Sequence, residues 1–306
     1  MNFANYAGDN PSTMNGWSTT DAKFVELCKN ILASPFSDQG LDARPKWEDG
    51  KPAHTRKVFG VAEYYDLRDG KLPILQLRPI NWKAALDEIF WIYQKCSNNI
   101  HDLNSHIWDS WADETGSIGK AYGYQIGKKA SYGDAQRNQM EAVLHDLTYS
   151  PMSRSILTNM YCHEDLHAMH LRPCVYSATF NVTHNDQTED LYLNAVVNQR
   201  SNDVMVANNW NVCQYAMLVI MVAHCTGLKP GFMVHMIADA HIYDRHEEHA
   251  KELIRRYEHD YADGEGYQPT MAINPSAKDW WTLTIDDIEV RDYYPDKRQI
   301  KLPVAI

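Results

Sequence analysis

Residues 190–226 carry the pattern that decides the fold: DLYLNAVVNQRSNDVMVANNWNVCQYAMLVIMVAHCT. Apolar and more polar side chains alternate over the first ten residues, and the apolar set is Leu191, Leu193, Ala195 and Val197. This alternation predicts a strand over 190–199 whose second face lies at an interface or beside a pocket. The segment 212–226 is almost continuously apolar and ends before Gly227, which predicts a buried helix with a glycine C-cap.

The same kind of pattern predicts the other elements. Apolar residues at helical spacing predict helices over 20–34, 81–95 and 136–147, and an exposed charged helix over 243–258. Strands are predicted over 54–67, 155–161, 174–183, 232–242, 268–273 and 281–289, with a hairpin turn at Asp69-Gly70. This order of elements predicts an α+β fold with a large sheet. Because no long linker or repeat interrupts the chain, we expect one domain over 1–306.

The composition argues against several kinds of partner. A net charge of −11 disfavours nucleic acid, whose phosphates need a basic surface, and the basic segments 127–129 and 253–256 are interpreted as solvated faces. No apolar run reaches the ~18 residues that a membrane helix needs, and residues 1–3 do not begin a signal peptide. The six cysteines show no paired spacing, so we expect reduced thiols and a cytoplasmic location.

A metal chemistry is suggested by the segment His163-Glu164-Asp165-Leu166-His167, which matches the pattern H-E-x-x-H. On an α-helix this spacing puts two imidazoles on one face for zinc, with the glutamate as general base. The chain has 14 histidines, which makes a chance match easier, and Pro173 leaves room only for a short helix. We therefore expect no metal and keep a zinc hydrolase as the remote alternative.

The polar residues at the ends of two neighbouring strands point to pyrimidine chemistry. Pro173-Cys174 precedes one strand, and Arg200-Ser201-Asn202-Asp203 ends the next. Pairing of the strands would bring Arg200 beside Cys174, and a cation lowers the pKa of a thiol that must attack an electron-poor ring. The Asn211 carboxamide offers a donor and an acceptor, which suits the O4 and N3–H edge of uracil better than cytosine. Taken alone, Cys174 is more simply interpreted as an inert core cysteine.

An ordered series of segments gives these residues a context. Upstream stand EIFW at 88–91, IWDSWADE at 107–114 and AYG at 121–123; then follow PCV at 173–175, QRSNDV at 199–204, WN at 210–211, DAHIY at 239–243 and LPVAI at 302–306. In these segments, from about residue 22 to the end, the chain resembles the folate-dependent thymidylate synthases.

The resemblance implies both the fold and the reaction. It implies a large mixed sheet flanked by helices, and a homodimer in which the sheets of two subunits pack together. It also implies transfer of a one-carbon unit from 5,10-methylenetetrahydrofolate to C5 of dUMP through a covalent cysteine adduct, giving dTMP and dihydrofolate. The implied partners are dUMP, the reduced folate and a second copy of the chain, with no nucleic acid, membrane or metal.

The resemblance further implies roles for single residues. Cys174 would attack C6 of dUMP, and Arg154 would reach the 5′-phosphate from the other subunit. The residues implied for catalysis are Cys174, Glu88, Tyr122, Arg200, Asn211 and Asp203. Those implied for binding dUMP are Arg44, Arg154, Gln199, Arg200, Ser201, Asn211, His241 and Tyr243. Those implied for the folate are Ile107, Trp108, Trp111, Asp203, Ala207, Trp210, Val304 and Ala305, and the last two belong to a tail that closes over it.

Several positions depart from the pattern of the family. Ser155 stands where a second arginine is usual, and Arg172 stands where a small residue is usual. The other departures are Ala207-Asn208-Asn209-Trp210 in place of Gly-x-Pro-Phe, Ala238 in place of glycine, and Pro45 in place of threonine. These changes keep a sibling reaction open, in which a hydroxymethylase traps the same methylene with water. Asn211 favours dUMP over dCMP as its substrate, because the dCMP enzymes carry aspartate there.

Overall fold

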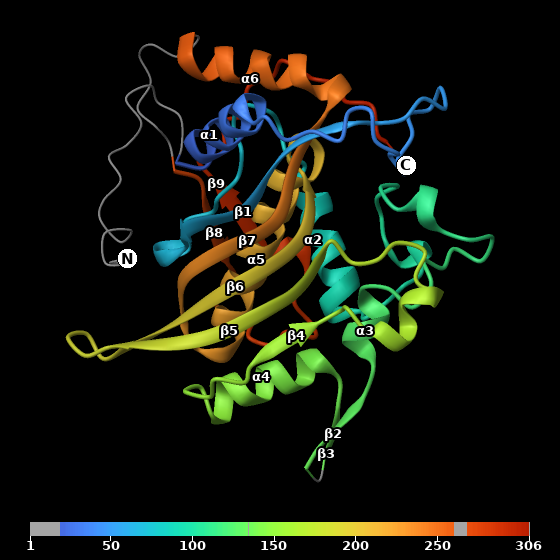
Figure 1. Cartoon of the computed structure of the whole chain (residues 1–306). Helices are drawn as coiled ribbons and strands as arrows, with labels where there is room; N and C mark the ends of the chain where they lie inside the picture. The colour runs from blue at the N-terminus through green and yellow to red at the C-terminus, as the bar shows by residue number, and fades with distance from the viewer. Residues whose placement is uncertain (1–18, 134, 260–267, 306) are drawn as a thin grey trace.

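A five-stranded mixed sheet forms the centre of the computed structural model, which describes residues 19–133, 135–259 and 268–305 (Figure 1). The strand order is β1-β7-β6-β5-β4, with bounds β1 (Thr55–Asp66), β7 (Lys229–Tyr243), β6 (Asp190–Asp203), β5 (Val175–Asn185) and β4 (Leu157–Asn159). β6 and β7 run parallel and the other pairs antiparallel. The prediction of an α+β fold with a large mixed sheet flanked by helices is confirmed. Residues 1–3, which the signal-peptide argument used, and Ile306 of the tail lie outside the described residues.

The two faces of the sheet differ in burial along every strand. One row of paired residues is buried throughout, and it consists of Thr158, Ala178, Val197, His235 and Glu63. The neighbouring row points to the opposite face and consists of Leu157, Thr179, Val196, Val234 and Tyr64. On that second face Leu157 is 48% exposed, and Val196 and Met236 are each 38% exposed. The sheet therefore covers its core on one side and carries accessible apolar side chains on the other.

Helix α5 (Asn209–Thr226) connects β6 to β7 and packs on the buried face of the sheet (Figure 1). From Val212 to Ala223 its side chains are buried all round, and Gly227 ends it with a φ of 73°, as the sequence predicts. The helix begins at Asn209, three residues before the predicted start, after one π-helical turn, η7 (Val204–Asn208). The apolar run marked only the buried part of the helix, because the first turn is polar.

The remaining helices cover the sheet and its edges (Figure 1). They are α1 (Thr19–Ala33), α2 (Trp82–Ile89), continued as a π turn in η3 (Phe90–Gln94), α3 (Gly123–Gly127), α4 (Gln139–Tyr149) and α6 (Glu247–His259). Short strands β2 (Ala130–Tyr132) and β3 (Ala135–Arg137) pair with each other, as do β8 (Thr270–Ile273) and β9 (Ile288–Arg291). None of the helices in the described residues is long and apolar enough to cross a membrane.

Three sequence predictions of local structure were wrong. The turn at Asp69-Gly70 closes no hairpin, because β1 pairs with β7 and not with the next strand along the chain. Most of 281–289 is turn and the 3-10 helix η9 (Ile285–Asp287), and strand geometry begins only at Ile288. Helix α4 begins at Gln139 instead of 136, because Asn138 forms a capping box with Glu141 and fixes the start.

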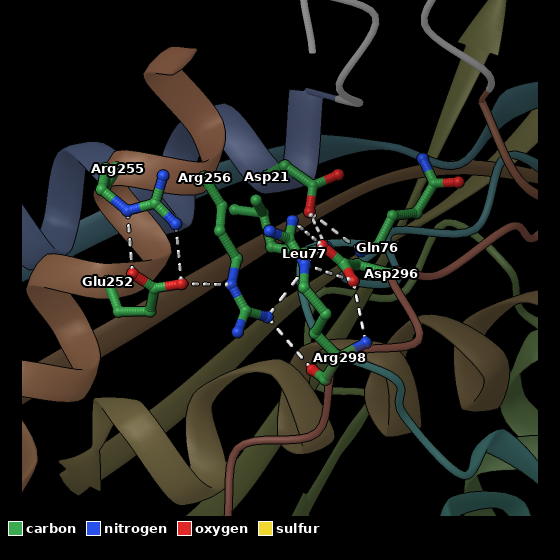
Figure 2. A network of polar contacts seen from close by, with 8 residues as sticks. All are labelled: Asp21, Gln76, Leu77, Glu252, Arg255, Arg256, Asp296 and Arg298. Carbon is green, nitrogen blue, oxygen red and sulfur yellow. Dashed lines mark hydrogen bonds and ion pairs between the residues drawn. The ribbon is translucent and has the colours of Figure 1, made fainter. Parts of the chain in front are cut away.

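The basic end of α6 is also only partly solvated, contrary to the sequence interpretation (Figure 2). Only 6% of the Arg256 side chain is exposed, and its guanidinium bonds Oε1 of Glu252 at 2.9 Å and the carbonyl of Arg298 at 3.1 Å. Asp296 carries an ion pair with Arg298, and its backbone N–H donates to the carbonyl of Gln76 at 2.7 Å. These contacts fasten the C-terminal segment to α6 and to the core.

Replacement of Arg256 by methionine should therefore destabilise the fold. We expect a loss of about 1–3 kcal/mol in the free energy of unfolding, because the Arg298 carbonyl and the Glu252 and Asp296 carboxylates lose a charged partner. Urea unfolding measures the loss. Arg255→Met is the matched control: its side chain is 48% exposed and bonds the same Glu252, so its effect should stay within about 0.5 kcal/mol. Equal losses of unfolding free energy in both variants would contradict the role of Arg256 in fastening the C-terminal segment.

Candidate active site

The pairing of β5 with β6 places a cation beside the Cys174 thiol. The backbone N–H of Arg200 donates to the carbonyl of Cys174 at 2.9 Å, and Nη2 of Arg200 lies 3.7 Å from Sγ. The same guanidinium donates to the carbonyls of Pro173, at 2.9 Å, and Arg172, at 2.7 Å. These backbone contacts hold the charge in place, so the juxtaposition expected from the sequence is present and rigid.

The surroundings of Cys174 act on its pKa in opposite directions. Burial raises the pKa of the thiol, while Arg200, the Tyr122 hydroxyl and Arg44 lower it, and the net direction is upward. Tyr122 lies close because its hydroxyl accepts the backbone N–H of Cys174 at 3.1 Å. Tyr122 has a φ of 48°, a conformation that L-residues rarely adopt and that is typical of functional sites. The thiol is therefore mostly protonated at neutral pH and needs its cations to ionise.

Glu88, on α2, is a buried carboxylate that accepts three N–H groups. Oε1 accepts from Nε1 of Trp108 at 2.8 Å, and Oε2 accepts from Nε1 of Trp210 and Nε2 of Gln214, both at 2.7 Å. Burial raises the pKa of Glu88, and the three donors oppose that rise. All three donors are uncharged, so the carboxyl is fixed in position without a counter-ion.

Asn211 belongs to a chain of carboxamides in the core. Its Oδ1 accepts from Nε2 of Gln199 at 3.1 Å, and its Nδ2 donates to Oε1 of Gln214 at 3.1 Å. Gln199 in turn accepts from Nε2 of His235 at 2.7 Å and from Nδ2 of Asn202 at 3.1 Å. Burial lowers the pKa of His235 to about 4, so this imidazole is neutral.

The unusual stretch before Asn211 has a structural explanation. Oδ1 of the buried Asn208 accepts from Nδ2 of Asn202 at 3.0 Å, which joins it to the carboxamide chain. The carboxylate of Asp203 caps the π turn η7 by accepting from the backbone N–H groups of Met205 and Val206. Ala207 lies in the same turn and is partly buried. Among the departures from the family pattern, Asn208 is thus used in the core, next to the turn that precedes Trp210 and Asn211.

Three arginines expected near a phosphate, and also Arg172, lack a carboxylate partner. Within the described parts of the chain, none of Arg44, Arg154, Arg172 and Arg200 forms an ion pair with an acidic side chain. Arg44 lies near enough to lower the pKa of Cys174 and that of Tyr243. Arg154 and Arg172 are exposed, and Arg172 contributes its backbone carbonyl to Arg200. Arg200 and Arg44 therefore supply positive charge beside the thiol.

His241 and Tyr243 lie at the end of β7, which pairs with the end of β6 that carries Ser201. Nδ1 of His241 is 2.7 Å from Oδ1 of Asp239, and its ring meets that of Tyr243 edge to face at 5.1 Å. Burial first, and then the charge of Asp203, raises the pKa of Tyr243 to about 12. The Tyr243 hydroxyl is thus a neutral hydrogen-bonding group.

The tryptophans expected to bind the folate divide into two kinds. Trp108 is buried with its ring 4.8 Å from that of Tyr122, and Trp210 is partly buried; both give their indole N–H to Glu88. Ile107 is 41% exposed and Trp111 is partly buried beside Trp108, at 5.6 Å between ring centroids. The accessible apolar wall therefore consists of Ile107 and Trp111.

The C-terminal tail is fastened by His246, which ends the 3-10 helix η8 (Asp244–His246) before α6. Its Nε2 donates to the carbonyl of Pro303 at 2.8 Å, its Nδ1 lies 3.8 Å from Oδ1 of Asp203, and it is fully buried. Beyond this point Val304 is 51% exposed and Ala305 is partly buried. No motif in the sequence identified His246, because its partners lie far away along the chain.

The H-E-x-x-H segment does not form the helix that a zinc site requires. Residues His163–Ala168 form the 3-10 helix η6, which has about three residues per turn, so side chains four apart do not share a face. Asp165 within it bonds Lys120 Nζ at 2.8 Å and Lys128 Nζ at 3.3 Å. In the described residues, no three His, Cys, Asp or Glu side chains gather as metal ligands. The segment thus lacks the helical arrangement of two imidazoles on which the alternative of a zinc hydrolase depended.

Comparisons with known proteins agree with this fold. The sequence profile of the thymidylate synthase family matches residues 22–306. The thymidylate synthase of Bacillus subtilis subsp. natto is 37% identical over 278 residues, which cover 89% of this chain and 94% of the relative. That of Bacillus phage phi3T is 36% identical over 278 residues, with the same coverage of 89% and 94%. The structure of thermostable thymidylate synthase A from Bacillus subtilis superposes with a TM-score of 0.83 at 36% identity, covering 94% of this chain and 99% of that one.

The fold and these matches define an enzyme of the methyltransferase class. The chain belongs to the thymidylate synthase family. That family methylates dUMP to dTMP with methylenetetrahydrofolate as the co-substrate. The family resemblance, the fold and the enzyme class predicted from the sequence are thus confirmed.

The charge of Arg200 should be measurable in the reactivity of Cys174. Replacing Arg200 by methionine should move the pH midpoint of Cys174 alkylation upward by about one unit, because a neighbouring cation is lost. Iodoacetamide labelling across a pH series, read by mass spectrometry of the Cys174 peptide, gives the midpoint. Arg172→Met serves as control, since Arg172 contacts Arg200 only through its carbonyl. An unchanged midpoint in the Arg200 variant would contradict this role.

Proposed function

We propose that Cys174 is the nucleophile of this enzyme in the methylation of dUMP to dTMP. The observation that carries the proposal is the guanidinium of Arg200 at 3.7 Å from the thiol, in a chain of this family. The Cys174 thiolate adds to C6 of the pyrimidine, C5 then takes the one-carbon unit and loses its proton, and elimination of the thiolate releases the product. The folate co-substrate supplies both the one-carbon unit and the hydride that reduces it to a methyl group.

The phosphate of dUMP is assigned to the arginines near Cys174. Arg200, Arg44 and Ser201 supply charge and hydrogen bonds from one subunit, and guanidinium groups bind phosphate through forked, charge-assisted hydrogen bonds. Their lack of carboxylate partners among the described contacts supports this assignment. Arg154 is assigned to the phosphate of the partner's site, and its exposure supports that assignment.

The rest of the nucleotide is assigned to β7 and α5. Asn211, held by Gln199, reads the uracil edge, and His241 with Tyr243 binds the sugar hydroxyl. Glu88 lies within the same polar chain and handles protons at the base, together with the Tyr122 hydroxyl beside Cys174. Each group is held by neighbours in the core, as positioning of a reacting base requires.

The folate is assigned to the apolar wall of Ile107 and Trp111 and to the accessible end of the tail. Val304 and Ala305 lie beyond the anchor at Pro303, and closure of this tail excludes water from the reacting methylene. Trp108, Trp210 and Asp203 are assigned to the back of the folate site, since their polar groups are used within the protein, and Ala207 is assigned beside them. The residues present thus fit a flat, largely aromatic co-substrate.

The working unit is proposed to be a homodimer of a single-domain chain in the cytoplasm. The accessible apolar face of the sheet, with Leu157, Val196 and Met236, supports sheet-to-sheet packing of two copies. All six cysteines are free, which fits a reducing compartment.

Product analysis tests the reaction. Incubation with dUMP and methylenetetrahydrofolate should yield a nucleotide heavier by one CH₂ group, together with dihydrofolate, as read by mass spectrometry. Cys174→Ser should lower turnover at least about a thousandfold, because a hydroxyl is a far weaker nucleophile than a thiolate. A hydroxymethyl product with tetrahydrofolate would establish the sibling hydroxymethylase instead. Turnover that survives in the serine variant would refute the covalent mechanism.

Mixing of inactive variants tests the role of Arg154. If Arg154 serves the partner's site, a dimer of one Cys174→Ser and one Arg154→Ala subunit has one complete site. Random exchange of subunits should then restore about one quarter of the wild-type sites, since half of the dimers are mixed and each has one such site. The activity of the mixture after unfolding and refolding together measures this. Absence of any recovery would place Arg154 in its own subunit's site, and full activity of the Arg154→Ala variant alone would place it outside both sites.

A further inference from the structure

Gln214 lies on α5 one turn after Asn211 and is only 2% exposed. Its Nε2 donates to Oε2 of Glu88 at 2.7 Å and to the carbonyl of Ala85 at 3.2 Å. Its Oε1 accepts from Nδ2 of Asn211 at 3.1 Å. Reversing this amide would set its oxygen against the Ala85 carbonyl, which can only accept, and against Oε2 of Glu88, which already accepts from Trp210. Glu88 and Ala85 therefore fix the direction in which Gln214 meets Asn211.

On its other side Asn211 meets Gln199, whose amide also has a fixed orientation. Nε2 of Gln199 donates to Oδ1 of Asn211 at 3.1 Å and to the carbonyl of Ser201 at 2.9 Å. Oε1 of Gln199 accepts from His235 and Asn202, so this amide cannot be reversed either. Asn211 thus has a donor on one side and an acceptor on the other, and both dictate the same orientation of its carboxamide.

The orientation of Asn211 decides which base edge it can complement. A carboxamide has two N–H donors and two acceptor lone pairs. Asn211 uses one lone pair to accept from Gln199 and one N–H to donate to Gln214. One donor and one acceptor remain, as O4 and N3–H of uracil require. Cytosine presents an amino donor and an N3 acceptor, so it needs the reversed amide. Reversal would set Nδ2 of Asn211 against the N–H of Gln199 and Oδ1 against Oε1 of Gln214.

We propose that Gln214 is a positioning residue that makes the enzyme select uracil over cytosine nucleotides. It acts through Asn211, and its direction is set by Glu88, so the same side chain joins the base reader to the buried carboxylate. The inference rests on the proposed function, in which Asn211 contacts the base.

Nucleotide binding to a Gln214→Met variant tests the proposal. Methionine keeps the length of the side chain and loses both the acceptor and the donor. The ratio of the Kd for dCMP to the Kd for dUMP, measured by titration calorimetry, should fall about fivefold, the factor that one net hydrogen bond commonly contributes. Most of the change should be weaker dUMP binding. A variant with the wild-type ratio would overturn the proposal.

A second variant separates the two contacts of Gln214. Gln214→Glu keeps an oxygen for Asn211 Nδ2 and loses the N–H groups that reach Glu88 and Ala85. Its Kd ratio should stay closer to wild type than that of Gln214→Met, while kcat for dUMP falls because a second carboxyl faces Glu88. Equal losses of the ratio in both variants would overturn the proposal, and this comparison stands even if one variant folds less well.

Gln125→Met is the matched control for buried amide loss. Gln125 lies in α3 and is 3% exposed. Its Nε2 donates to the carbonyl of Lys120 and to the carboxylate of Asp165. It should lower the thermal midpoint, as Gln214→Met does, and leave the Kd ratio unchanged. If the wild-type enzyme binds dUMP and the Gln214 variants keep its ratio of the Kd for dCMP to the Kd for dUMP, this inference fails and the proposed function stands. A wild-type enzyme that neither binds nor methylates dUMP defeats the proposed function.

Discussion

The buried carboxylate of Glu88 is the constraint on which the site depends. A carboxylate in the core is costly unless hydrogen bonds satisfy its oxygens, and here two indoles and one carboxamide do so. Those donors come from α5 and from the loop that carries Trp108, while Glu88 itself comes from α2. Satisfying one charge therefore forces three separate segments into a single arrangement. The geometry for pyrimidine chemistry follows from that arrangement.

The sheet supplies the second half of the site. Parallel pairing of β6 with β7 requires a crossover, and α5 provides it, so the first turn of α5 lies at the end of β6. Antiparallel pairing of β5 with β6 then brings the start of one strand to the end of the other, which joins Cys174 to Arg200. Charge, thiol and base reader meet at one end of the sheet because of these two kinds of pairing.

Much of the fold could be predicted from residues 190–226, because alternation and a continuous apolar run are local signals. The juxtaposition of Cys174 and Arg200 also followed, since it needs only the pairing of two consecutive strands. The π turn before α5 could not be foreseen, because it depends on the Asp203 cap and on the hydrogen bond between Asn202 and Asn208, and neither contact leaves a periodic pattern in the sequence. His246 and Gln214 were missed for a similar reason: their roles come from partners 57 and 126 residues away.

The neutral His235 has a consequence for how the enzyme responds to acidity. Its pKa of about 4 keeps one hydrogen on Nε2 and one tautomer throughout the physiological range, and that hydrogen bonds Gln199. Gln199 orients Asn211, so no titration between mild acid and neutrality reaches the base reader from this side. In the function proposed above, turnover depends on ionisation of the Cys174 thiol, whereas the Asn211 carboxamide is held on the Gln199 side by a network that stays neutral.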